Sequence, residues 1–131
     1  MRLDHVQVAA PPGCEERARA FYGGLLGLAE LEKPAPMRAS GGAWFALEGA
    51  QLHVGVEDPF APATKAHPGL AVRDDELDAL AARLEEAGAA VTWDDRYPGI
   101  RRFFTADPFG NRVELLSAGA APGEDAERPE R

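Results

Sequence analysis

Three histidines and one glutamate occupy paired positions that suit a metal site. The chain contains only three histidines, His5, His53 and His67. Nearly the same number of residues separates His5 from His67 as separates His53 from Glu114. Neutral imidazoles and a carboxylate are ligands for divalent Zn, Ni, Co, Mn or Fe. If the chain repeats one module at this interval, the four side chains form two equivalent pairs of candidate metal ligands.

The residues around His53 and Glu114 alternate in the manner of strands. Apolar residues flank His53 within Gln51–Val56 and flank Glu114 within Arg112–Leu116. Since successive side chains of a strand point to opposite faces, both candidates are expected opposite the core, toward a cleft. An ion held by three imidazoles and one carboxylate keeps a net positive charge. Such an ion can polarise a bound oxygen or lower the pKa of a bound water.

The elements that must position these residues occur twice along the chain. The first half predicts a strand, a helix ended by Gly27, and three strands: Leu3–Ala9, Cys14–Leu26, Leu28–Glu32, Ala43–Leu47 and Gln51–Val56. The second half predicts a strand from about His67, a helix capped by Asp74 or Asp75 and ended by Gly88, and three strands: 67–72, 74–87, Ala89–Trp93, Arg101–Thr105 and Arg112–Leu116.

Each half is therefore a βαβββ module, and the predicted fold class is α+β. The two modules, at about 1–60 and 65–118, are expected to pair as a curved mixed sheet around a central cleft. Together they make one domain over residues 1–118. Residues 119–131, rich in Ala, Pro, Gly and charged residues, are predicted to be a polar flexible tail.

Composition narrows the classes of partner. The 131 residues carry a formal charge of −8 at neutral pH, which argues against nucleic acid or an anionic membrane as a partner. No apolar run has the length of a signal peptide or a membrane helix, and the single cysteine permits no internal disulfide, so we predict a cytoplasmic protein. Cys14 lies near a helix N-terminus that could lower its pKa, but a tolerated small residue is the favoured interpretation.

Four segments carry a resemblance to a known family. The chain resembles the vicinal oxygen chelate superfamily of glyoxalases, bleomycin-resistance proteins and extradiol dioxygenases. The resemblance covers about residues 1–118 and rests on Leu3-Asp4-His5-Val6, Phe21-Tyr22-Gly23-Gly24-Leu25-Leu26-Gly27-Leu28, Gln51-Leu52-His53-Val54-Gly55-Val56 and Asp107-Pro108-Phe109-Gly110-Asn111-Arg112-Val113-Glu114-Leu115. It implies paired βαβββ modules, and in many members a metal bound by residues of the first and last strands.

The resemblance also implies an activity. His5, His67 and Glu114 match ligand positions of glyoxalase I, fosfomycin-resistance thiol transferases and extradiol dioxygenases, whereas glyoxalase I usually has a carboxylate where this chain has His53. We therefore expect a metal-dependent enzyme that chelates a small substrate through adjacent oxygens, most readily a lyase or isomerase, with dioxygenase or thiol transferase chemistry as other possibilities. The alternative is a drug- or metabolite-binding resistance protein without catalysis.

Further residues are assigned roles within that expectation. Glu114 is the candidate catalytic base, and the candidate substrate contacts are Gln7, Trp44, Tyr97 and Arg101. The expected partners are a small-molecule substrate and a second copy of the chain in a homodimer. The sequence leaves open which metal and substrate are bound, and whether the ligands come from one chain or from two.

Overall fold

The structure, a computed structural model, describes residues 1–118, so the predicted tail at 119–131 lies outside the described residues. The chain divides into two compact units. The first consists of Met1–His67 and Ala106–Arg112, and the second of Pro68–Thr105 and the chain from Val113 onward. The prediction of two repeated modules is confirmed, because each unit is built on one βαβββ series.

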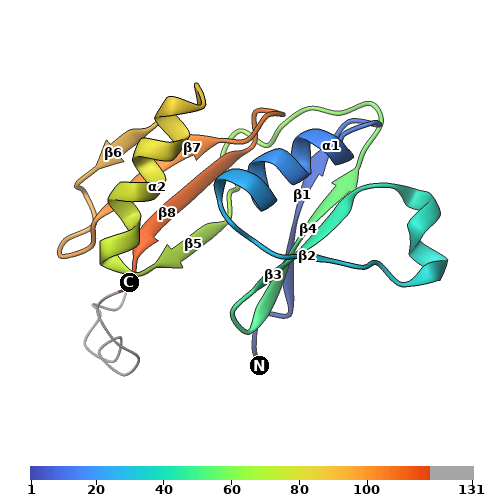
Figure 1. The fold of residues 1–131 in the computed structure, drawn as a ribbon, viewed down its shortest axis with the longest axis horizontal. Coiled ribbons are helices and arrows are strands. Elements are labelled where there is room, and N and C mark those ends of the chain that lie inside the picture. The colour runs from blue at the N-terminus through green and yellow to red at the C-terminus, as the bar shows by residue number, and fades with distance from the viewer. Residues whose placement is uncertain (119–131) are drawn as a thin grey trace. The chain divides into compact units, whose positions relative to one another are not determined.

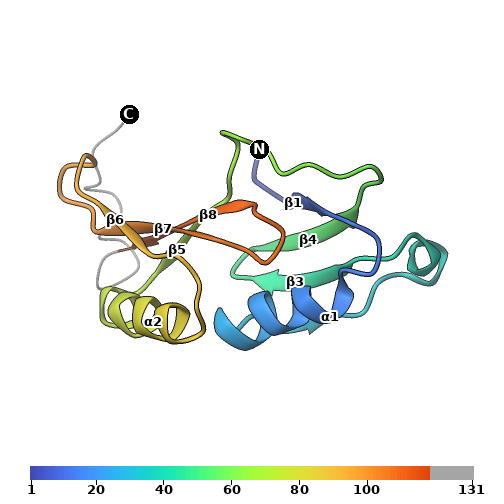
Figure 2. The ribbon, with the colours of Figure 1, turned by 90° about the horizontal axis from the view of Figure 1, so that it is seen from above.

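The first unit contains a four-stranded mixed sheet. Its elements are β1 (His5–Ala10), α1 (Glu15–Ala18), η1 (Arg19–Leu25), β2 (Glu30–Leu31), the 3-10 helix η2 (Ala35–Ser40), β3 (Ala43–Leu47) and β4 (Ala50–Val56). The strand order is β1-β4-β3-β2, with β1 parallel to β4 and the other pairs antiparallel. Figures 1 and 2 show the helical segment formed by α1 and η1 lying along one face of this sheet.

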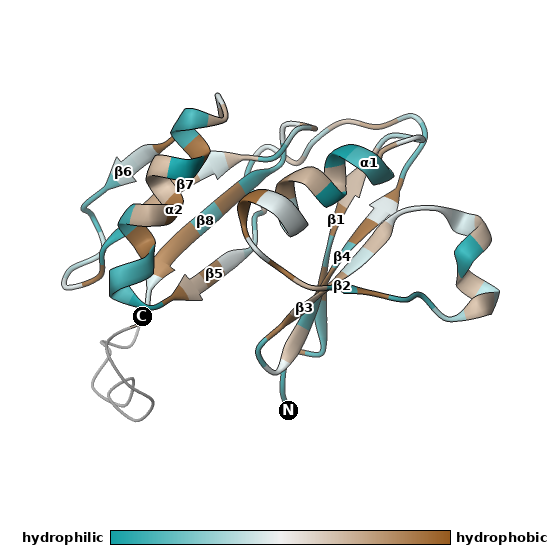
Figure 3. Ribbon diagram, in the orientation of Figure 1, coloured by the Kyte–Doolittle hydropathy of each residue, from teal (hydrophilic) through white to brown (hydrophobic). Residues whose placement is uncertain are grey.

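The second unit repeats this plan. Its elements are β5 (Gly69–Val72), α2 (Asp74–Glu86), β6 (Thr92–Asp94), β7 (Arg102–Ala106) and β8 (Arg112–Ser117). The strand order β5-β8-β7-β6 matches that of the first sheet, and β5 is parallel to β8 as β1 is to β4. Figure 3 shows the apolar character of β8 and the polar start of α2.

Each helix buries one apolar face on its own sheet. In the first unit the buried side chains include Ala18, Phe21, Tyr22, Phe45, Leu52 and Val54, and in the second Leu77, Leu80, Ala81, Leu84, Phe103, Val113 and Leu115. Both predicted helix terminators are confirmed, since Gly27 and Gly88 have φ angles of +77° and +86°, where a side chain would be strained.

Several predicted boundaries are corrected by the structure. The strands expected at Leu28–Glu32 and Ala89–Trp93 shorten to β2 and β6, and β5 begins after Pro68 rather than at His67. Neither Asp74 nor Asp75 caps α2. Arg73 is the N-cap residue, and both aspartates lie in the first turn, where their charges favour the helix dipole.

The strand registers of the two sheets are equivalent. Gln7 pairs with His53 across β1 and β4, and Gly69 pairs with Glu114 across β5 and β8. His5 lies two residues before Gln7, and His67 lies two residues before Gly69. The backbone therefore places His5 and His67 at matching positions, and His53 and Glu114 at matching positions, as the sequence spacing predicts.

Candidate functional site

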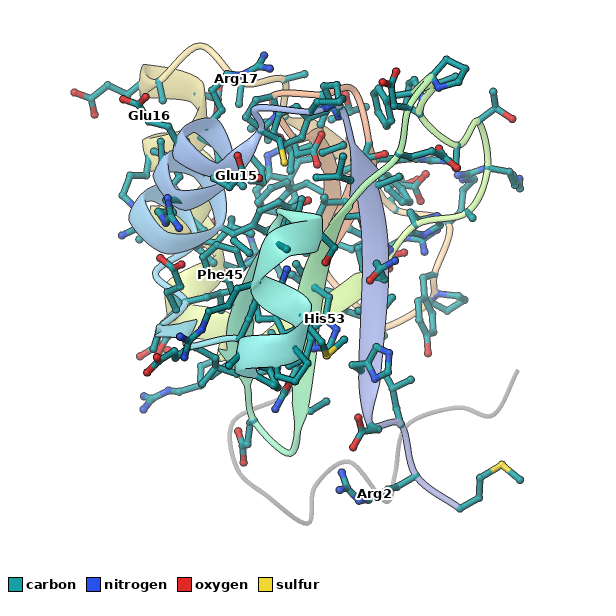
Figure 4. All side chains as sticks on the ribbon, turned by 90° about the vertical axis from the view of Figure 1, so that its right-hand side faces the viewer. Arg2, Glu15, Glu16, Arg17, Phe45 and His53 are labelled. Carbon is teal, nitrogen blue, oxygen red and sulfur yellow. The ribbon has the colours of Figure 1, made fainter. Side chains whose placement is uncertain are left out.

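Polar and aromatic side chains gather on the face of the first sheet opposite its helix. Trp44 and Gln7 both pair with His53 in the strand register, and His5 lies two residues from Gln7, so these four side chains share one face. Figure 4 shows His53 on this face and Phe45 on the other side of the sheet, toward the helix. The prediction that His53 points away from the core face is therefore confirmed.

Three rings on this face form a continuous stack. The ring centroids of Trp44 and His53 lie 3.9 Å apart with parallel planes. The centroids of His53 and His5 lie 4.4 Å apart with planes inclined by 14°. The imidazole of His53 is thus sandwiched between the indole of Trp44 and the second imidazole.

Hydrogen bonds orient both imidazoles. His5 Nδ1 lies 2.9 Å from Oδ2 of Asp4, so Nδ1 is the ring nitrogen that donates to the carboxylate. His53 Nε2 lies 2.8 Å from Oε1 of Gln51. Burial, followed by the nearby charge of His5, lowers the pKa of His53, so its ring is neutral at pH 7. Neutral imidazole is the form that binds a metal ion.

A pocket of about 570 Å³ opens over this face, and His5, Gln7, Trp44 and His53 all line it. Lys33, Met37 and Ser40, within or just before η2, contribute to its lining. The side chain of Gln7 lies over Gly55, where a Cβ atom would come within 2.7 Å of the Gln7 amide. A side chain at position 55 would therefore displace the Gln7 amide from its place on the pocket face.

His67 lies at the end of the first unit, outside any strand. Its side chain is exposed, and its Nδ1 lies 3.0 Å from the carbonyl oxygen of Lys65. Pro68 follows it and supplies the carbonyl that accepts a hydrogen bond from the backbone N–H of Glu114.

The second sheet carries a partly buried charge network. Oε2 of Glu114 accepts a hydrogen bond from Nη1 of Arg102 at 3.2 Å, and Nη2 of Arg102 donates to Oδ1 of Asp94 at 3.1 Å. Asp94 also accepts from the side chain and backbone of Arg96, whose hydrogen bonds hold the pKa of Asp94 below its usual range. Glu114 is therefore an ion-paired carboxylate.

A second pocket, of about 600 Å³, lies within the second unit and includes Tyr97 and Arg101 in its lining. The guanidinium of Arg101 binds Asp78 of α2 at 2.7 Å and lies 5.1 Å from the ring centroid of Trp93. The candidate substrate contacts thus fall into two groups, Gln7 and Trp44 in the first unit and Tyr97 and Arg101 in the second.

Comparison with known proteins decides the family. The family model described as Glyoxalase/Bleomycin resistance protein/Dioxygenase superfamily matches residues 2–115. The chain belongs to this superfamily. A search of curated proteins gave no match.

Solved structures agree with this assignment. A glyoxalase family protein from Bacillus anthracis is 44% identical, with a TM-score of 0.84 over 89% of this chain and 94% of that chain. The fosfomycin resistance protein FosX from Listeria monocytogenes is 17% identical (TM-score 0.73, 95% and 98% coverage), and the lactoylglutathione lyase from Agrobacterium tumefaciens is 20% identical (0.68, 88% and 92%). The last two share the fold with this chain. Among residues 1–118, no helix is both long and apolar enough to cross a membrane.

The donors in this superfamily member fit a divalent metal in chemical type. His5 presents Nε2 with a carboxylate behind its other nitrogen, which is the usual arrangement behind a metal-bound histidine. Within residues 1–118, however, no group of three His, Cys, Asp or Glu side chains is assembled as a metal centre. The structure brings together His5 and His53, while Glu114 belongs to the second unit.

The ring stack restricts how His5 and His53 could share an ion. An imidazole binds a metal along a lone pair in the plane of its ring, at about 2.0–2.1 Å from the nitrogen. The two rings are nearly parallel, with centroids 4.4 Å apart. An ion that lies on the in-plane lone pair of one ring is therefore well away from the lone-pair direction of the other. Joint binding requires one ring to turn out of the stack.

Three residues that matter here were not among the sequence candidates. Asp4 and Gln51 hold the two imidazoles, and Arg102 holds Glu114. Gln51 could have been found by alternation, since it lies two residues before His53 on the same face. The favoured interpretation of Cys14 agrees with the structure, because its thiol is buried and burial raises its pKa.

Proposed function

We propose that this chain is a small metal-dependent enzyme of glyoxalase type, acting as a lyase or isomerase on a substrate with two adjacent oxygens. The proposed ligands are His5, His67 and Glu114, with His53 as a fourth once its ring leaves the stack. The observation that carries the proposal is the equivalent register of the two modules, in which Gln7 faces His53 and Gly69 faces Glu114. A duplication that served only the fold would not require side chains able to bind a metal at the equivalent positions of both modules.

A bound metal ion would be chelated by the two substrate oxygens and would stabilise the negative charge that develops on them. The chain's own residues supply the remaining functions. The amide of Gln7 hydrogen-bonds the substrate, and Trp44 provides an apolar wall that excludes water from the pocket. Glu114 is the proposed base that takes up a proton, and Tyr97 and Arg101 are proposed to orient the substrate from the second module.

A binding protein without catalysis is the second candidate, and two observations favour it. The stack of Trp44, His53 and His5 gives the imidazoles a packing role, and the pair with Arg102 gives Glu114 a partner. In this case the negatively charged protein sequesters a cationic or aromatic drug, with Trp44 or Trp93 as the stacking surface. Such binding should survive both chelation of metal and Glu114→Gln.

The test combines reconstitution with a substrate panel. Protein stripped with chelator is reloaded anaerobically with each divalent metal and titrated with 2-oxoaldehydes plus thiols, with catechols and with epoxides. Turnover that requires metal and disappears in Glu114→Gln supports the enzyme and names the substrate class. Ligand binding that is unchanged by chelator and by Glu114→Gln, with no turnover in any arm, supports the binding protein instead.

We also propose a homodimer, because related single chains of this size commonly pair. Sedimentation velocity at micromolar concentration should give a species of twice the chain mass. A monomer at that concentration would contradict the dimer without affecting the proposed chemistry.

A further inference from the structure

Arg102 lies between two carboxylates on the second sheet. Its Nη1 donates to Oε2 of Glu114 at 3.2 Å, and its Nη2 donates to Oδ1 of Asp94 at 3.1 Å. All three side chains are largely enclosed, with exposed fractions of 13% for Arg102, 13% for Asp94 and 7% for Glu114. Pairs this enclosed are screened far less by water than surface ion pairs.

Aromatic rings further restrict the guanidinium. Its central carbon lies 5.6 Å from the ring centroid of Tyr97 and 5.1 Å from that of Phe104. A planar guanidinium with two charged acceptors and two rings beside it has few other positions available. Because the guanidinium of Arg102 is held in place, it also fixes the orientation of the Glu114 carboxylate.

The charges of this network balance. Asp94 also binds Arg96 at 2.6 Å, so that two carboxylates face two guanidiniums. Asp94 partly offsets the charge of Arg102, which reduces the repulsion that Arg102 would exert on a nearby ion. A carboxylate that accepts a hydrogen bond can still bind an ion, and metal-binding carboxylates usually have such a partner.

We propose that Arg102 is a positioning residue for the metal: it holds Glu114 in the orientation in which that carboxylate binds a divalent ion, while Asp94 holds Arg102 in place. This inference rests on the proposed function, since it requires Glu114 to be a ligand. It adds two residues, Arg102 and Asp94, whose contribution to metal affinity is exerted through Glu114.

The experiment is a titration of chelator-treated protein with Co²⁺, followed by the visible absorption of the bound ion and by calorimetry. Three variants are compared. Arg102→Met removes the guanidinium, and Arg102→Lys keeps a positive charge with a single nitrogen. Asp94→Asn keeps an oxygen that accepts from Arg102 but removes the negative charge of the carboxylate. The matched control is Arg73→Met, because Arg73 forms an exposed ion pair with Asp75 within the same unit. Circular dichroism and thermal melting of each variant establish that it is folded.

We expect Arg102→Met to weaken Co²⁺ binding by about 10–100-fold and to alter the absorption spectrum, as the loss of a partner behind a ligand typically does. Arg102→Lys should recover part of the affinity, Asp94→Asn should lose a smaller factor, and Arg73→Met should match the unaltered protein. Equal or tighter binding by folded Arg102→Met overturns the inference, the tighter result meaning that Arg102 competes with the ion. If Arg102→Met does not fold, unaltered affinity in both Arg102→Lys and Asp94→Asn overturns it. Absence of Co²⁺ binding by the unaltered protein instead overturns the proposed function, and this inference with it.

Discussion

The two modules share a backbone plan and differ in the chemistry of their open faces. On the first sheet, His53 lies in a stack of rings with Trp44 and His5. On the second sheet, the matching position is Glu114, which lies in a chain of partly buried charges with Arg102 and Asp94. Equivalent strand registers therefore support a neutral donor group in one module and an anionic donor in the other.

The hairpin turns of the two modules differ as well. Glu48 and Gly49, in the turn between β3 and β4, are exposed, whereas Asp107, Phe109 and Asn111, in the turn between β7 and β8, are buried. There Asp107 accepts hydrogen bonds from the hydroxyl of Tyr22 at 2.7 Å and from Asn111, whose side chain also donates to the carbonyl of Ala9. A repeated fold thus tolerates divergence both at its site and at its turns, provided that buried polar groups keep partners.

The largest difference in stability is expected between the two equivalent donors. In metal-free protein, Glu114→Gln removes the charge that faces the buried guanidinium of Arg102 and should lower the free energy of unfolding by about 3 kcal/mol. His53→Gln removes a stacked neutral ring and should lower it by about 1 kcal/mol. Urea denaturation of the two variants measures the difference. Equal losses would show that the charge network and the ring stack contribute alike.

The hydroxyl of Tyr22 tests the buried turn. Tyr22→Phe removes a hydrogen bond to a buried carboxylate that keeps its other donors, so the free energy of unfolding should fall by about 2 kcal/mol near neutral pH. Urea denaturation at pH 7 measures this loss. A loss within error of zero would mean that the hydrogen bond to Asp107 does not stabilise the turn.

The same residue predicts a dependence on alkaline pH. Burial, with the adjacent charge of Asp107, raises the pKa of Tyr22 above its ordinary value of 10. A raised pKa means that the folded state retains the proton while the unfolded state loses it, so its contribution is complete below pH 10 and declines above that pH. The unaltered protein should lose about 1.4 kcal/mol per pH unit more than Tyr22→Phe above pH 10. Parallel curves for the two proteins would contradict the raised pKa.

The smallest expected effect is a change in the fluorescence of Trp44. Because burial lowers the pKa of His53, protonation of the ring stacked on Trp44 should quench the emission of Trp44 with a midpoint below pH 6.5. The measurement uses Trp93→Phe, so that Trp44 is the remaining tryptophan. Adding His53→Gln to Trp93→Phe should abolish the pH-dependent change in fluorescence. If the change persists, a group other than His53 causes it.

Local patterns in the sequence predicted much of this structure. Strand alternation placed His53 opposite Leu52 and Val54, and helical spacing identified the buried face of α2, because both depend on neighbours along the chain. The segment Ala35–Ser40 was not predicted as η2, since it contains Pro36 and shows no apolar periodicity. Its contribution to the pocket lining was therefore missed.

The side-chain contacts between neighbouring strands could not be predicted from the sequence. Of two adjacent arginines, Arg101 was selected as a substrate contact, while Arg102 is the one that binds Glu114. Which of them faces Glu114 depends on where β7 begins and how it pairs, and the strand begins one residue later than the prediction. The stack of His5 on His53 likewise depends on the parallel register of β1 and β4, which alternation within a single strand does not specify.

We propose that donors of different chemistry, placed by a repeated module and including His5 and Glu114, bind one divalent metal ion. The most direct test of this proposal is the metal content of the purified, reloaded protein, measured by elemental analysis with His5→Ala and Glu114→Ala as variants and Arg73→Met as the control. We expect close to one transition ion per chain in the unaltered protein and in the control, and close to none in either variant. Full metal content in Glu114→Ala, or no metal in the unaltered protein under any loading condition, would contradict it.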